Sequence, residues 1–198
     1  MPKRSINMTP ADVYQMLEKL NLELKQEGVS AHMVMAGGAV MTTSYGSRLT
    51  TQDIDAVFEP TEEIRRATHR IADEIGVEQD WLNDGVKGFI NPATMGTEPL
   101  FSFSNLIVEQ LDAESMLCLK LTSARFDEEK DMVDAIVLMK HLGLSSVDEA
   151  FSIVENKAYP NQMTPKSQYF ILEAFEAYKE EYLSCPNRPD LEEEDPGL

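Results

Sequence analysis

The sequence predicts an α/β (α+β) fold, in which a small mixed β-sheet core is packed with helices and followed by a helical C-terminal half. Short apolar runs at 33–36, 54–58 and 106–111 are typical of strands in a core. After residue 111, apolar residues recur mainly at helical spacing. A chain of 198 residues is long enough to bury one core of this kind.

The first helices have clear start and stop signals. Thr9 and Pro10 begin the first helix, as the cap and the first helical residue, and Gly28 ends it. A second long helix is expected at 60–75, where Gly76 stops it.

The segment 77–104 has no clear periodicity and indicates an irregular excursion, with short strands near Phe89 and Phe101. Trp81 is expected in the core because it is large and mostly apolar. The functional alternative is that one of the polar residues at 83–84 lies near the mouth of a site.

Four helices are expected after the last strand. Asp112 caps the first, which ends near Arg125, and Ser146 with Glu149 forms a capping box for the third. The second is expected at 128–142, and the last begins at Thr164 and ends around residue 183. The predicted division is a core at 1–111, a helical part at 112–184 and an acidic, disordered tail at 185–198.

Charge and composition restrict the classes of partner. The formal net charge of -18 makes a broad nucleic-acid-binding surface an unfavourable interpretation, because acidic surfaces repel phosphate backbones. No run approaches about 18 uninterrupted apolar residues, so no membrane span is expected. Residues 1–6 lack the apolar centre of a signal peptide, and Cys118 and Cys185 have no metal-ligand spacing. These features predict a cytoplasmic protein.

The stretch 33–58 is the strongest candidate for a functional site. An apolar strand leads into Gly37-Gly38, a short helix is expected at 39–45, and a second strand carries Asp53 and Asp55. Because side chains alternate along a strand, both carboxylates are predicted to face the same side. Two neighbouring carboxylates repel each other unless a cation lies between them.

The chemistry of this stretch suits Mg²⁺ and a phosphate. Mg²⁺ prefers oxygen ligands and often completes its shell with water and substrate phosphates. Glycines at a strand-to-helix turn let a ligand approach the backbone, and a helix N-terminus favours an anion. The chain contains neither the GxxxxGK loop of the Walker nucleotide-binding proteins nor a GxGxxG dinucleotide fingerprint.

Gly37-Gly38, then Arg48 and Thr50, then Asp53 and Asp55 resemble the signature of the polymerase-beta-like nucleotidyltransferases. The resemblance spans about residues 30–140 and points to the small bacterial branch related to the AbiEii-type toxins. It implies metal-dependent transfer of a nucleoside monophosphate from an NTP, with pyrophosphate leaving. It also implies a toxin–antitoxin or phage-defence setting.

The resemblance assigns roles to individual residues. Expected metal ligands are Asp53 and Asp55, with Glu109 as the candidate third acid. Expected catalytic residues are Asp53, Asp55, Lys120 and Asp131. Expected nucleotide-binding residues are Gly37, Gly38, Ser47, Arg48 and Thr50.

Several alternatives remain open at this stage. Glu109 could be an ordinary exposed strand acid, and Arg48 a solvent-facing loop residue. Lys120, Asp131 and Asp134 could form a structural ion-pair cluster between two helices or act near the chemistry. The acceptor could be a protein side chain, a small molecule or a tRNA end. The chain could also be a degenerate fold that binds nucleotide without turnover, or an antitoxin-like protein-binding module.

Overall fold

The computed structural model describes residues 4–123 and 129–183. Arg125 and the predicted acidic tail lie outside these residues. The described residues form seven α-helices and one five-stranded mixed sheet, which confirms the predicted α/β fold class. The α-helices are α1 (Pro10–Glu27), α2 (Gly37–Thr43), α3 (Thr61–Ile75), α4 (Ala113–Ser123), α5 (Glu129–Leu142), α6 (Val147–Lys157) and α7 (Pro165–Tyr178).

Three short helical turns complete the helical structure of the described residues. They are η1 (Gly85–Gly88), η2 (Pro160–Gln162) and η3 (Lys179–Leu183). No helix in the described part of the chain is both long and apolar enough to cross a membrane.

The sheet has the strand order β3-β2-β1-β5-β4. β1 is antiparallel to β2 and parallel to β5, β2 is parallel to β3, and β4 is antiparallel to β5. The strands are β1 (Ala31–Ala36), β2 (Ile54–Glu59), β3 (Leu82–Asn83), β4 (Thr97–Ser102) and β5 (Leu106–Leu111).

The two faces of the sheet differ in burial. Met33, Ala56 and Val108 lie on the face that is fully buried, whereas Val34 on the other face is only half-buried. α1 and α3 lie together on one side of the sheet, and ion pairs such as Arg70 with Glu23 join their outer surfaces.

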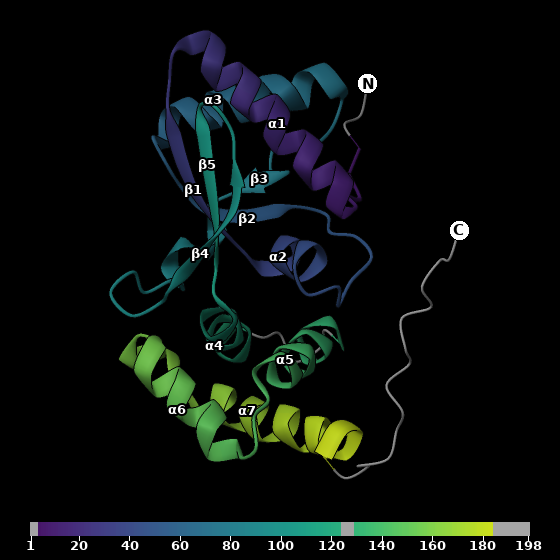
Figure 1. Ribbon diagram of the computed structural model, residues 1–198, viewed down its shortest axis with the longest axis vertical. Helices are drawn as coiled ribbons and strands as arrows, with labels where there is room; N and C mark the ends of the chain where they lie inside the picture. Colours follow the sequence, from purple (N-terminus) through teal and green to yellow (C-terminus); the bar gives the residue numbers. More distant parts are fainter. Residues whose placement is uncertain (1–3, 124–128, 184–198) are drawn as a thin grey trace, which may run out of the picture.

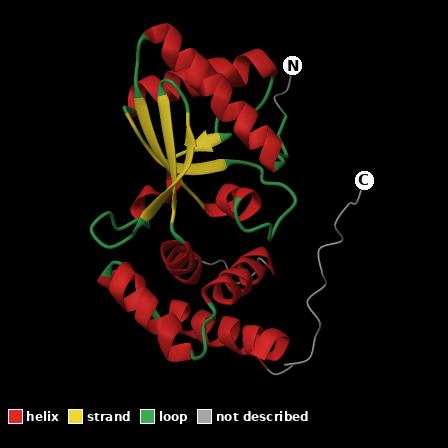
Figure 2. Cartoon of the chain, viewed as in Figure 1, coloured by secondary structure: helices red, strands yellow, loops and turns green. Residues whose placement is uncertain are grey.

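The helices α4 to α7 form a second layer below the sheet half, and α2 lies between the two parts (Figure 1). Figure 2 shows the same division, with every strand in the upper half and only helices in the lower layer. The chain passes directly from β5 into α4, whose first turn is capped by Asp112 Oδ1, which accepts from Ser115 N at 2.7 Å. This connection brings α4 and α5 close to the start of β2.

Most predicted element boundaries are confirmed. The Thr9 cap, the Gly28 and Gly76 helix ends and the strand at 106–111 are present as predicted. Trp81 lies in the core, where its indole N–H donates to Thr68 O at 3.2 Å.

Three local predictions are wrong. The helix at the glycines is Gly37–Thr43, so it begins and ends two residues earlier than the predicted helix at 39–45, because the glycines themselves form its first turn. No strand forms at Phe89, where η1 turns the chain instead, although β4 contains Phe101 as expected. The Ser146 side chain makes no cap bond, and Ser145 donates its N–H and Oγ–H to Glu149.

Candidate functional site

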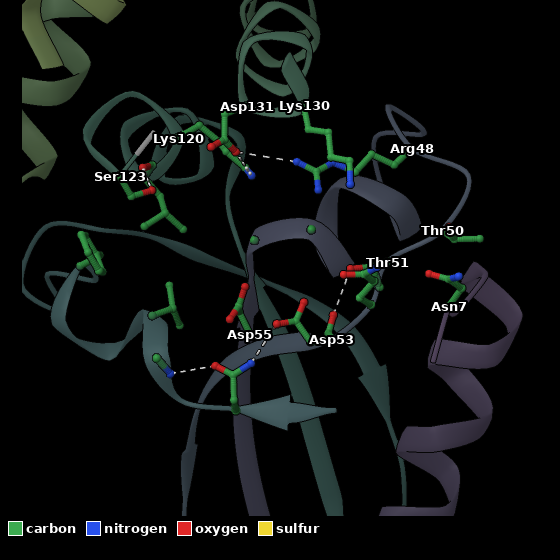
Figure 3. Close-up of a pocket in the computed structure, with 18 of the residues that line it drawn as sticks. Asn7, Arg48, Thr50, Thr51, Asp53, Asp55, Lys120, Ser123, Lys130 and Asp131 are labelled. Carbon is green, nitrogen blue, oxygen red and sulfur yellow. Dashed lines mark hydrogen bonds and ion pairs between the residues drawn. The ribbon is translucent and has the colours of Figure 1, made fainter. Parts of the chain in front are cut away.

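A cavity of about 940 Å³ lies between the sheet half and the helices α4 and α5. Its walls come from the start of β2, the first turn of α2, the segment around η1, the end of α4 and the start of α5. In Figure 3, Asn7 and Thr50 lie at one end of this pocket and Ser123 at the other, with Asp53 and Asp55 on the floor between them.

Both predicted carboxylates line the pocket. Asp53 directly precedes β2 and Asp55 is its second residue, and Figure 3 shows both side chains on the pocket side, as the strand alternation predicts. Asn83 Nδ2 donates to Asp53 Oδ2 at 3.1 Å, and Asn83 Oδ1 accepts from Gly85 N at 2.9 Å. The second bond fixes which way the Asn83 amide faces, so its N–H₂ group is directed at Asp53.

The glycines allow the acids and the helix start to come together. Gly37 has φ +66, and a Cβ at this position would lie 2.5 Å from Asp55 Oδ2. A Cβ at Gly38 would lie 2.9 Å from Thr51 Oγ1 and 3.3 Å from Arg48 Nη1. Only residues without a side chain therefore permit this close approach. Ala36, the residue before α2, supplies no side-chain cap to the first turn.

A buried ion-pair network forms the opposite wall. The carboxylate of Asp134 is fully buried and accepts from Ser47 Oγ at 2.8 Å and from Arg48 Nε at 3.0 Å. Arg48 Nη2 donates a second bond to the same carboxylate, so the pair is bidentate. Lys120 Nζ lies 2.8 Å from Asp134 Oδ2. The network therefore joins the α2–β2 loop to α4 and α5.

Asp131 is the acid of this network that reaches the pocket. It accepts from Lys120 Nζ at 3.2 Å, and Arg48 Nη2 lies 3.8 Å from its Oδ1. Lys120, Arg48 and Asp131 all line the cavity (Figure 3), whereas the fully buried Asp134 is not among the lining residues. The two interpretations of this cluster are thus compatible, because the same residues form a structural ion pair and a wall of the pocket.

Two predicted site residues lie elsewhere. The Ser47 hydroxyl is bonded to Asp134 and is not among the residues that line the cavity. Glu109 accepts from Thr97 Oγ1 at 3.3 Å and pairs with His32 Nε2 at 2.7 Å, outside the cavity. The structure therefore does not bring the candidate third acid to the pair at Asp53 and Asp55.

The strand register explains the separation of Glu109. Glu109 is opposite Val34 on β1, and Val34 is opposite Val57 on β2, so Glu109 is in line with Val57 and not with Asp55. Strands lie about 4.8 Å apart and residues rise about 3.4 Å along a strand, so two strands and two residues separate the Cα atoms of Glu109 and Asp55 by about 12 Å.

Several lining residues were not predicted from the sequence. Lys130 is the second residue of α5, next to Asp131, and extends into the pocket (Figure 3). The sequence signal for Lys130 was its position next to Asp131, which was itself a predicted site residue. Asn7 reaches the pocket because Met8 N donates to Thr51 O at 2.7 Å and Thr51 N donates back to Met8 O at 2.9 Å. No local sequence pattern predicts this backbone bridge between Met8 and Thr51. Of the two residues at 83–84, Asn83 lines the pocket.

The charges of the pocket favour a cation together with an anion. No group of three or more His, Cys, Asp or Glu side chains that could hold a metal ion occurs in the described residues. The pocket instead combines acids and bases around the glycine turn. The acids are Asp53, Asp55, Glu129 and Asp131, and the cationic side chains are Arg48, Lys120 and Lys130.

Comparison of the chain with protein-family models, with characterised proteins and with solved structures finds no match in any of the three.

Proposed function

We propose that this chain is a nucleotidyltransferase that moves a nucleoside monophosphate from an NTP to an acceptor, with Mg²⁺ as cofactor. The observation that carries the proposal is that Asp53, Asp55 and the glycine turn at Gly37 line one pocket, opposite a wall of cationic side chains. The acceptor, and the toxin–antitoxin or phage-defence setting that the resemblance implies, remain predictions.

The pocket suits Mg²⁺ bound together with a substrate. Mg²⁺ is usually held by one or two carboxylates, with water and substrate phosphates completing its shell. Asp53 and Asp55 would supply those carboxylates. When bound, the ion would supply charge stabilisation to the reacting phosphate.

Other roles in the reaction, proton transfer and binding of the leaving pyrophosphate, would fall to side chains of the pocket. Asn83 holds Asp53 in place, and the resemblance implies that one of the two aspartates takes the proton of the acceptor hydroxyl. The acceptor oxygen then forms a bond to the α-phosphorus while the bond from that phosphorus to the β-phosphate bridge breaks. The electron pair leaves with pyrophosphate, whose charge would be met mainly by Lys130 on the facing wall, since Lys120 already pairs with Asp131 and Asp134.

The test is incubation of the protein with each α-labelled NTP, Mg²⁺ and candidate acceptors, with pyrophosphate release measured in parallel. We expect Asp53→Ala to abolish labelling and pyrophosphate release. Asp80→Ala removes an exposed acid outside the pocket and is the matched control, which should behave as the parent. Equal labelling of the parent and Asp53→Ala would refute the proposal.

One observation favours a second candidate, a fold that binds Mg-NTP without turning it over. Glu109 lies about 12 Å from Asp55 by the strand register, so the pair lacks the expected third acid. Calorimetry that detects Mg-NTP binding by the parent, without pyrophosphate release over all acceptors, would favour this candidate over the transferase.

A further inference from the structure

We propose that Phe89 is the platform on which the base of a bound nucleotide stacks, an inference that rests on the proposed nucleotide site. Phe89 is the only aromatic residue among the described residues that line the pocket, and 40% of its surface is exposed. The other apolar side chains of the lining, Val86 and Leu119, are largely buried. The pocket therefore offers one accessible flat apolar surface within an otherwise polar wall.

The position of Phe89 is fixed by backbone bonds in the structure. Phe89 N donates to Val86 O at 2.9 Å, which closes the η1 turn. Phe89 O accepts from Gln162 Nε2 at 3.2 Å, and the next carbonyl, Ile90 O, accepts from the Tyr159 hydroxyl at 3.2 Å. The helical layer thus holds the chain on the C-terminal side of the turn, and less ordering is required when a ligand arrives.

The same segment connects the platform to the acids. Asn83, which is bonded to Asp53, ends β3, and Gly85 N, at the start of η1, donates to the Asn83 side chain; Phe89 follows directly after η1. One short stretch of backbone therefore sets both the orientation of Asp53 and the location of the ring. This is the arrangement expected where the triphosphate and the base of one ligand are bound at the same time.

Stacking on an aromatic ring is tolerant of base identity, because every base has a π-face. We therefore expect all four ribonucleoside triphosphates to bind, the purines more tightly than the pyrimidines because their rings cover more of Phe89. Inorganic tripolyphosphate with Mg²⁺ contains the anion without the base, so its affinity should not depend on Phe89.

The experiment is calorimetric titration of the full chain with the four Mg-NTPs and with Mg-tripolyphosphate. Phe89→Leu keeps an apolar side chain but removes the flat ring, and it should weaken NTP binding about tenfold. The same variant should bind tripolyphosphate as the parent does. Tyr169→Ala, which removes an exposed aromatic ring of α7 outside the pocket, is the control and should change neither affinity.

A second variant distinguishes loss of the aromatic ring from a folding defect in Phe89→Leu. Phe89→Trp keeps an aromatic ring and should retain NTP affinity, with quenching of its fluorescence by NTP and not by tripolyphosphate. The single native tryptophan, Trp81, is 1% exposed in the core and should not contribute to that quenching.

The outcomes separate this inference from the proposed function. NTP binding by the parent that is unchanged in Phe89→Leu, or lowered equally for NTP and tripolyphosphate, would overturn the platform and leave the nucleotide site standing. A parent that binds neither NTP nor tripolyphosphate in the presence of Mg²⁺ would overturn both.

Discussion

Replacement of Asp134 tests whether the buried network holds the two halves of the pocket together. Its carboxylate is fully buried and bonded to Ser47, Arg48 and Lys120, which come from the α2–β2 loop and α4. Asp134→Ala leaves Arg48 and Lys120 with only Asp131 as an acidic partner in this cluster. Removing one member of a buried ion pair costs about 3 to 5 kcal/mol, because the remaining charge is desolvated without compensation.

That cost is large relative to the whole stability of a protein of this size. Unfolding free energies are about 5 to 15 kcal/mol, so Asp134→Ala should remove at least about a fifth of the total, and much more if the protein is at the lower end of that range. The melting temperature should fall by about 2 to 4 °C per kcal/mol, which corresponds to about 10 °C. Urea denaturation followed by circular dichroism gives the change in unfolding free energy at constant m-value.

Two further variants separate the ionic effect from lost packing. Glu18→Ala removes an exposed acid of α1 and should change the free energy of unfolding by no more than about 0.5 kcal/mol. In an Arg48→Met and Lys120→Met background, Asp134→Ala should cost less than half of its cost in the parent, because no cation is left unpaired. The reasoning is refuted if Asp134→Ala alone destabilises the protein by less than about 1 kcal/mol, or if the double background does not reduce its effect.

Two other predictions concern the glycine turn and the buried thiol. Gly37→Ala should destabilise the protein by more than Gly28→Ala, and should also abolish Mg-NTP binding, measured by calorimetry. Both positions have a φ near +66, where a residue with a side chain is strained by about 1 to 2 kcal/mol. Only at Gly37 would the new Cβ also meet the Asp55 carboxylate. Equal destabilisation by the two variants would contradict the importance of the contact between Gly37 and Asp55. Burial raises the pKa of the Cys118 thiol from 9.0 to about 12, so this group stays protonated and unreactive at pH 9 in the folded protein. In a Cys185→Ser variant, the thiol reagent DTNB should therefore react with Cys118 only after unfolding in urea, and rapid reaction of the native protein would contradict its burial.

The sequence predicts what local patterns determine. Thr9 with Pro10, and Gly28, mark helix α1 because caps and left-handed helix ends depend on neighbouring residues. The pair at Asp53 and Asp55 could be assigned to one side because strand alternation is equally local. At 145–149 the same reasoning fails, since two adjacent serines can both serve Glu149 and only the path of the loop selects Ser145.

The rest of the site depends on contacts between distant segments. Arg48 and Asp134 are 86 positions apart, and no spacing rule connects them. The sequence therefore left Arg48 as either a phosphate ligand or a solvent-facing loop residue. The structure places it on the pocket wall with its guanidinium bonded to a buried acid. Glu109 fails for the same reason, because the register between strands, and not the acid's own neighbours, decides which residue lies beside Asp55.

The pairing of the cations changes what the pocket requires of a metal ion. Arg48 and Lys120 each contact Asp131 or Asp134, so their charges are largely compensated before a ligand arrives. Lys130 is the third cationic side chain of the lining, and a triphosphate, which carries several negative charges, would lie beside Asp53 and Asp55. The negative charges of the triphosphate and of the two carboxylates would repel each other strongly in a partly desolvated site. The proposed function therefore predicts that nucleotide binding depends on a divalent cation, and calorimetric titration with NTP in EDTA should show much weaker binding than titration with Mg-NTP.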